Sequence, residues 1–161
     1  MNSLHTILAP LFARRYYHVL IMLIVFIMGA CSPDKKTYTS DCDDEQTFKK
    51  VSFTHLLDSL SYYDQQYIEV TGVYREGKEQ SALYDQAAAI PVNNKAIWVN
   101  FSQECELYLV GTRIGLFEYN DGKFTQMNNK LLRIRGKVDT HNKGHLNQYK
   151  GCIDRVSLIE L

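Results

Sequence analysis

The sequence predicts a mainly β fold of the α+β class, a small barrel of five to six short strands preceded by one amphipathic helix. Short segments in which apolar and polar residues alternate recur between residues 67 and 161, and glycines interrupt two of them. One segment alone has clear helical spacing. Eleven tyrosines suit the pleated surface of a sheet. Coiling glycines in short strands favour a closed barrel over a sandwich, because closure removes exposed strand edges.

The helix is predicted just after residue 51. Ser52 is a good N-cap, and the apolar residues that follow it recur at i, i+3, i+4 and i+7. These residues therefore share one helical face: Phe53, Leu56, Leu57 and Leu60.

The strands follow from alternation with period two. Residues 67–75 place Ile68, Val70, Gly72 and Tyr74 on one face, and Gly72 predicts a bulge or a sharp coil. Further strands are expected at 79–84, 96–101, 131–139 and 151–161. In 131–139 the charged residues Arg133, Arg135 and Lys137 face away from the apolar ones.

The N-terminal stretch Val19–Cys31, VLIMLIVFIMGAC, follows Arg14 and Arg15. Its apolar core is shorter than the about 20 residues that span a bilayer, so it predicts a cleaved signal peptide over residues 1–30. Met28–Cys31 resembles the lipobox of bacterial lipoproteins. That resemblance implies cleavage before Cys31 and attachment of acyl chains to its sulfur. The alternative is an ordinary secreted protein in which Cys31 merely lies near the cleavage site.

Residues 31–50 are polar and acidic, without an apolar period, and predict a flexible stalk. The barrel domain is expected over residues 51–161. A lipid anchor would place it in the bacterial cell envelope, outside the cytoplasm, with the outer membrane favoured. Membrane contact through the anchor, envelope proteins and glycans are the expected partners.

The charge of the chain argues against one class of ligand, and its cysteines predict a disulfide. Without residues 1–30 the chain carries 16 basic and 18 acidic residues, which argues against nucleic-acid binding. Besides Cys31, three cysteines remain in a compartment that permits disulfides. We expect a bridge between Cys105 and Cys152, since both fall inside the folded part, while Cys42 lies in the stalk.

The order of these segments resembles a group of small bacterial envelope proteins, often lipoproteins, with OB-type barrels. The similarity covers residues 51–101 and 130–161, and residues 102–129 depart from it as a longer insertion. The resemblance implies a fold and an address, and no particular activity. It rests on Tyr63, Asp64, Gly72, Ser81, Leu83, Tyr84, Trp98, Gly136, Gly144, His145 and Gly151.

Two groups of residues could form a binding surface. Tyr67, Tyr74 and Trp98 offer aromatic rings for a glycan or a peptide. Arg133 and Arg135 could meet anionic groups, although an exposed strand face paired with Glu69 explains the same alternation.

His141 and His145, spaced H-x3-H, are weak metal-ligand candidates for a metal-dependent hydrolase. The intervening Asn-Lys-Gly is typical of a turn, which does not force both imidazoles onto one face, so bracing by hydrogen bonds is favoured. There is no nucleophile elbow or phosphate loop. We expect no catalytic residues, no cofactor and a binding or scaffolding role.

Overall fold

The computed structural model describes residues 35–161 except for 44, 89–90 and 119–123. The predicted signal peptide and lipidation site Cys31 lie outside the described residues. Among the residues that are described, no helix is long and apolar enough to cross a bilayer.

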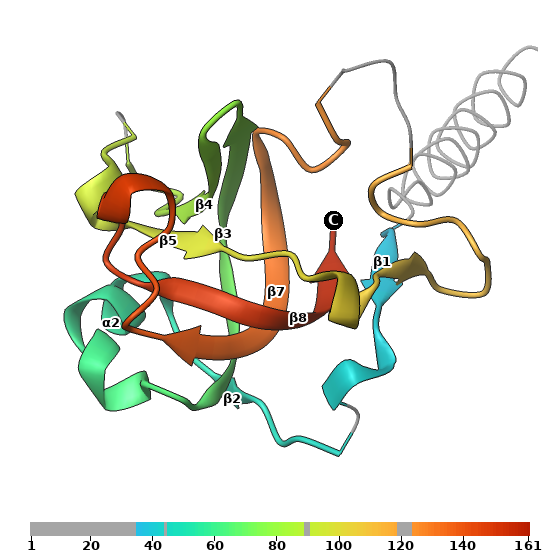
Figure 1. The fold of residues 1–161 in the computed structure, drawn as a ribbon, viewed down its shortest axis with the longest axis horizontal. Coiled ribbons are helices and arrows are strands. Elements are labelled where there is room, and N and C mark those ends of the chain that lie inside the picture. Colours follow the sequence, from blue (N-terminus) through green and yellow to red (C-terminus); the bar gives the residue numbers. More distant parts are fainter. Residues whose placement is uncertain (1–34, 44, 89–90, 119–123) are drawn as a thin grey trace, which may run out of the picture. The chain divides into compact units, whose positions relative to one another are not determined.

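Five strands form a closed barrel in the order β3, β4, β5, β8, β7 and back to β3 (Figure 1). All neighbours are antiparallel except β5 and β8. The arrangement confirms the predicted mainly β barrel and is compatible with an OB-like fold. The strands are β3 (Tyr67–Gly77), β4 (Gln80–Tyr84), β5 (Ala96–Val99), β7 (Lys130–Asp139) and β8 (Cys152–Glu160).

The long strand β3 makes closure possible because it pairs on both edges. Its residues 67–74 pair with β7, and its residues 73–77 pair with β4 across a two-residue turn. The predicted alternation is confirmed: Ile68, Val70 and Tyr74 are buried in the barrel, while Thr71 is exposed.

The predicted helix is present as α2 (Phe53–Asp58), followed by the 3-10 turn η2 (Leu60–Tyr63). Ser52 is the N-cap, and its hydroxyl accepts a hydrogen bond from the His55 amide at 3.3 Å. Phe53, Leu56 and Leu60 enter the barrel core. This face therefore attaches the helix to the barrel, as its apolar spacing predicts.

The bulge expected as one possibility at Gly72 lies instead at Gly136. The β3–β7 register runs through Gly72 without a bulge, and a Cβ there would lie 3.2 Å from the Phe53 ring. Gly72 thus makes room for α2. The bulge lies between Arg135 and Lys137, and a Cβ at Gly136 would lie 2.7 Å from the Asp154 carbonyl oxygen.

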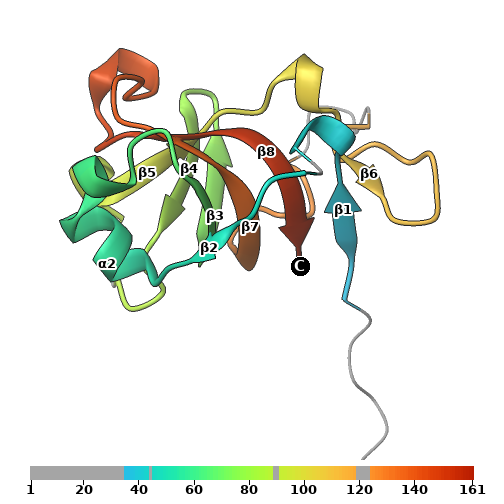
Figure 2. The ribbon, with the colours of Figure 1, turned by 90° about the horizontal axis from the view of Figure 1, so that it is seen from below.

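Three short strands lie outside the barrel: β1 (Thr37–Thr39), β2 (Lys49–Lys50) and β6 (Tyr108–Leu109). β1 pairs with β8 and β6, and β2 pairs with β3 (Figure 2). The flexible stalk predicted over residues 31–50 is therefore corrected from Lys35 onward. Tyr38 is 2% exposed and belongs to the core, but a three-residue strand is too short to show a period.

Within the described residues, the remaining regular elements are four single 3-10 turns: η1 (Asp41–Asp43), η3 (Asn93–Lys95), η4 (Gln103–Cys105) and η5 (His145–Asn147). The disulfide joins Cys42 of η1 to Cys105 of η4, with the Cα atoms 5.3 Å apart. This corrects the predicted pair of Cys105 and Cys152. Cys152 is a free thiol with no exposed surface on β8, where it pairs with Trp98 of β5.

Candidate binding groove

The three aromatic residues predicted as one surface do not lie together. Tyr67 and Tyr74 are both on β3, but they are seven residues apart and so point to opposite faces. The Tyr67 ring packs outside the barrel, edge-on to Phe48 with ring centroids 5.7 Å apart. Tyr74 points inward and is 2% exposed. A surface that combines all three rings is therefore excluded.

Trp98 lies on the outer face of β4 and β5, under the loop that joins β7 to β8. Its ring centroid is 5.1 Å from that of Tyr149, and a Cβ at Gly144 would lie 2.5 Å from the indole. Burial raises the pKa of Tyr149 to about 12. The loop thus covers the indole and forms a second small apolar cluster with Tyr84.

The two arginines are held by carboxylates of the barrel wall. Arg135 donates from Nε to Glu69 Oε2 at 2.8 Å, and Arg133 lies 3.5 Å from the same oxygen. Arg133 also pairs with Glu160. Glu69 is only 7% exposed, and a buried carboxylate needs compensating charge. The two guanidinium groups supply that charge. The pairing with Glu69 is the one expected for an outward strand face.

The two histidines face different carboxylates. His145 Nε2 lies 3.4 Å from Glu79, while potential ligand atoms of His141, Asp64 and Asp139 lie within 4.8 Å of one another. Asp64 already accepts two hydrogen bonds from Thr140, from the amide and from the hydroxyl. These bonds lower the pKa of Asp64. The H-x3-H pair is not brought to one site, and the Asp64 bonds brace the start of the loop.

A groove opens where β3 turns into β4 and where β5 ends. Its first part is a hollow of about 450 Å³. At its floor the Tyr74 hydroxyl lies 3.1 Å from Ser81 Oγ, which donates to the Val99 carbonyl at 2.8 Å. Burial raises the pKa of Tyr74, so its hydroxyl stays protonated. The lining residues are Tyr74, Glu76, Gly77, Gln80, Ser81, Trp98, Val99, Asn100, Phe101 and Phe117.

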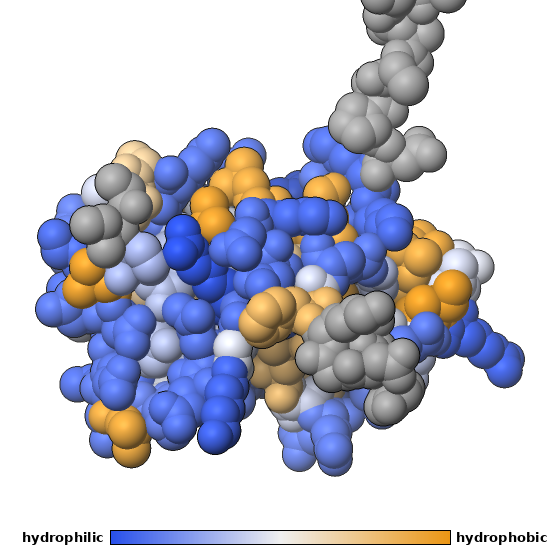
Figure 3. Space-filling view, turned by 90° about the horizontal axis from the view of Figure 1, so that it is seen from above, coloured by the Kyte–Doolittle hydropathy of each residue, from blue (hydrophilic) through white to orange (hydrophobic). Residues whose placement is uncertain are grey.

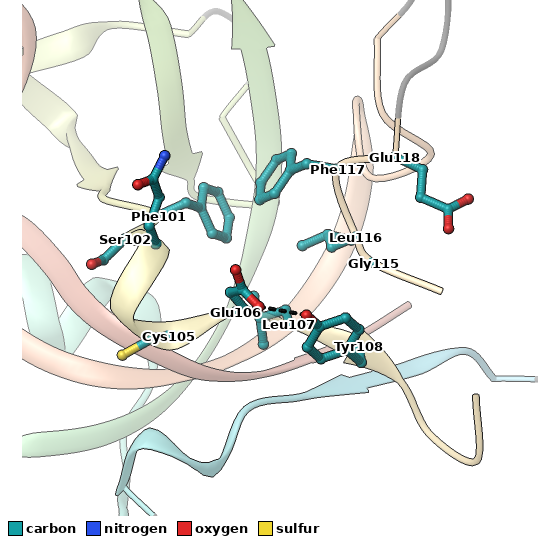
Figure 4. A pocket seen from close by; sticks show the side chains of 11 residues that line it. Phe101, Ser102, Cys105, Glu106, Leu107, Tyr108, Gly115, Leu116, Phe117 and Glu118 are labelled. Carbon is teal, nitrogen blue, oxygen red and sulfur yellow. Dashed lines mark hydrogen bonds between the residues drawn. The ribbon is translucent and has the colours of Figure 1, made fainter. Parts of the chain in front are cut away.

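The second part is a cavity of about 320 Å³, formed by the segment between β5 and β7. Phe101 and Phe117 line both parts, with ring centroids 4.8 Å apart, and lie beside each other at the rim (Figure 4). Phe117 is 53% exposed. The other lining residues are Ser102, Gln103, Cys105, Glu106, Leu107, Tyr108, Gly115, Leu116 and Glu118. We call the two parts together the barrel-mouth groove.

The charge of the barrel-mouth groove is negative. Of the described residues that line it, Glu76, Glu106 and Glu118 are acidic and none is basic. Glu76 binds the amide and hydroxyl of Thr125. Glu106 accepts a hydrogen bond from the Tyr108 hydroxyl, which raises the pKa of Tyr108 (Figure 4). The Glu118 side chain points away from the rings.

The volume of each part of the groove lies within the range of known binding pockets, and the second part is the more apolar of the two. Cavities of roughly 300–1,000 Å³ with apolar walls and a few polar groups are typical of binding pockets, and barrel mouths are a common place for them. One face of the molecule is mostly hydrophilic and carries separate clusters of apolar residues, drawn in orange (Figure 3). The groove therefore offers aromatic contact beside negative charge.

Two groove residues, Tyr74 and Trp98, belong to the binding surface that the sequence predicts, whereas Phe101 and Phe117 do not. Phe117 lies in an irregular segment, where no period distinguishes an exposed ring from a buried one. The available signal was composition, because apolar residues are frequent in 101–118.

Comparison of this chain with family models, with curated proteins and with solved structures finds no match.

Proposed function

We propose that this protein is a lipid-anchored bacterial envelope protein that holds an OB-like barrel at a membrane outside the cytoplasm. The anchor rests on Val19–Cys31, in which a short apolar core ends at Met-Gly-Ala-Cys. Two or more acyl chains on Cys31 would hold the chain on a bilayer without a membrane-spanning helix. The favoured membrane is the outer one.

We further propose that the barrel is a binding module without enzymatic activity, and that its ligand is a peptide segment of an envelope protein. The observation that carries this proposal is the exposed Phe117 ring at a largely apolar cavity whose lining includes Glu106 and Glu118. Aromatic side chains that become buried against a partner often contribute a large share of the binding energy at protein interfaces. Acidic groups at the rim favour a basic partner.

A glycan is the less favoured ligand. Sugar rings bind on the open faces of aromatic side chains, and the Trp98 face is covered by Gly144 and Tyr149. Phe101 and Phe117 meet edge to face at 70°, which leaves no flat aromatic platform between them. An apolar peptide side chain fits such an angled pair better.

The proposed lipid anchor is tested by labelling with a fatty acid. We expect label on the wild-type chain and none on Cys31→Ser. Label that persists in Cys31→Ser would contradict the anchor.

The ligand class is tested by titrating the full-length protein with peptides of one composition in two forms. One form places an aromatic residue beside two lysines, and the other replaces the lysines with glutamates. We expect only the basic form to bind. Its affinity should be at least about tenfold lower in Phe117→Ala. Glu106→Gln should reduce its salt dependence.

Tyr62→Ala is the matched control, because Tyr62 is an aromatic residue 61% exposed on η2 and does not line the groove. Equal binding of both peptide forms, or equal loss in Tyr62→Ala and Phe117→Ala, would contradict the proposal. Binding of neutral oligosaccharides that is lost in Phe117→Ala would favour the glycan reading instead.

A further inference from the structure

The hairpin after β6 lies beside the N-terminal end of β1 (Figure 2). The two strands are antiparallel, with Leu109 opposite Tyr38, and the Val110 amide donates to the Thr37 carbonyl at 2.9 Å. Because the strands are antiparallel, the chain after Leu109 runs toward Lys35. The hairpin tip and the start of the folded unit therefore lie at the same edge of the molecule.

The hairpin tip is an ordered turn. The Leu109 amide donates to the Ile114 carbonyl and the Thr112 amide to the Leu109 carbonyl, both at 2.9 Å. Gly111 adopts a positive φ of 77°, which the reversal requires. These bonds define the path of the backbone at the tip relative to β1.

The tip presents large aliphatic side chains to solvent. Val110 is 59% exposed and Ile114 is 45% exposed, although both are β-branched residues that are usually buried. Arg113 between them is also exposed. Residues 109–115 include no acidic side chain. Exposed apolar side chains beside a basic one favour contact with a membrane interface, where the apolar groups leave water and the cation meets anionic lipid.

Lysines add to the positive charge of this edge. Lys36 is exposed and donates to the neutral amide of Gln126 at 2.9 Å, while Lys35 shares its charge with Glu160. The exposed acidic Asp41 lies beyond the opposite end of β1. Lys36 and Arg113 are therefore exposed cationic groups at the end of β1 where the hairpin tip lies, beside the Lys35–Glu160 pair.

The tether to the anchor is short. Four residue steps separate Cys31 from Lys35, and a fully extended chain spans at most about 3.6 Å per residue, which gives about 14 Å. The headgroup region of one leaflet is roughly 5–8 Å thick. A domain tethered at Cys31 thus cannot hold this edge far from the bilayer surface.

From the hairpin, its charge and the tether length we propose that the tip Val110–Ile114, together with Lys36, inserts into the headgroup region of a phospholipid bilayer. The proposal rests on the proposed lipid anchor at Cys31. Insertion of the tip fixes the orientation of the barrel relative to the bilayer, because a second contact besides the anchor restricts rotation about the tether.

The test uses the full-length lipidated protein in vesicles of phosphatidylcholine with phosphatidylglycerol. The photo-crosslinking residue p-benzoylphenylalanine replaces Val110, Ile114 or, as the matched exposed control, Tyr62. After irradiation we expect lipid adducts at positions 110 and 114 at least about fivefold above position 62. Arg113→Glu should lower the yield at 110 on these anionic vesicles.

The acylation of Cys31 is measured by mass spectrometry in the same samples, which separates this proposal from the anchor. If Cys31 is acylated and the yield at 110 and 114 equals that at 62, the hairpin proposal is overturned while the anchor stands. If Cys31 carries no acyl chain, the anchor and the hairpin proposal are both overturned. Adducts at 110 with protein instead of lipid would also overturn the hairpin proposal.

Discussion

Gly144 packs directly against the face of Trp98. A Cβ atom at position 144 would lie 2.5 Å from Cδ2 of the indole, closer than side-chain atoms approach one another. Gly144 also has φ 64° and ψ −156°, a conformation that is essentially restricted to glycine. The loop between β7 and β8 is thus fixed onto the outer face of β5 by a residue without a side chain.

The first prediction concerns this contact. Gly144→Ala should lower the free energy of unfolding by about 2–4 kcal/mol, because it combines backbone strain with a clash. Gly115→Ala is the matched control: it has ordinary φ and nothing within 4 Å of its Cβ position, so its effect should stay within about 0.5 kcal/mol. Denaturant unfolding measures both. Equal effects at the two positions would contradict the packing described.

The second prediction concerns the disulfide. Peptide mapping without reduction should link Cys42 to Cys105 and find Cys152 as a thiol. Removing the crosslink with Cys42→Ser should lower stability by about 2–5 kcal/mol. Adding Cys105→Ser to Cys42→Ser should lower the stability little further, because the disulfide is already lost. A larger additive loss would show that the two residues act independently.

The Cys152 thiol provides a separate measurement. Burial raises its pKa, so little of the reactive thiolate forms near neutral pH. We expect alkylation of Cys152 in the folded protein to be far slower than in denaturant. Fast alkylation under native conditions would mean that β8 is not packed as described.

The third prediction concerns acid stability. The hydrogen bond from Arg133 holds the pKa of Glu160 below its ordinary value of 4.5. The ionised carboxylate therefore stabilises the folded state above about pH 4.5, and this contribution is lost as the pH falls through the lower, folded pKa. The stability difference between wild type and Glu160→Gln should shrink from about pH 6 to about pH 3. A constant or growing difference would contradict the pairing.

Alternation was sufficient to predict the barrel, because β3 and β7 each bury one face for many residues. In β7 the buried positions Leu132, Ile134 and Val138 alternate with half-exposed charged residues, which leaves little choice of face. The helix was equally predictable, since an N-cap and an apolar stripe coincide. Its end was not, because η2 continues the same face with 3-10 geometry.

Short elements and tertiary contacts could not be predicted. β1 and β6 have too few residues for a period, and pairing of Cys42 with Cys105 depends on how those strands dock. The barrel-mouth groove depends on the path of the irregular segment that brings Phe117 against Phe101, 16 positions away. Local propensity contains no information on such a path.

The most direct test of the proposed function is photo-crosslinking from the barrel-mouth groove in intact cells. p-Benzoylphenylalanine at Phe117 keeps an aromatic ring at the rim, and the same residue at Tyr62 is the control. We predict a discrete protein adduct at position 117, with the crosslinked peptide rich in lysine or arginine, and a lower adduct yield when Glu106 is changed to glutamine. A yield no higher than at position 62, or an acidic crosslinked peptide, would contradict a peptide-binding groove.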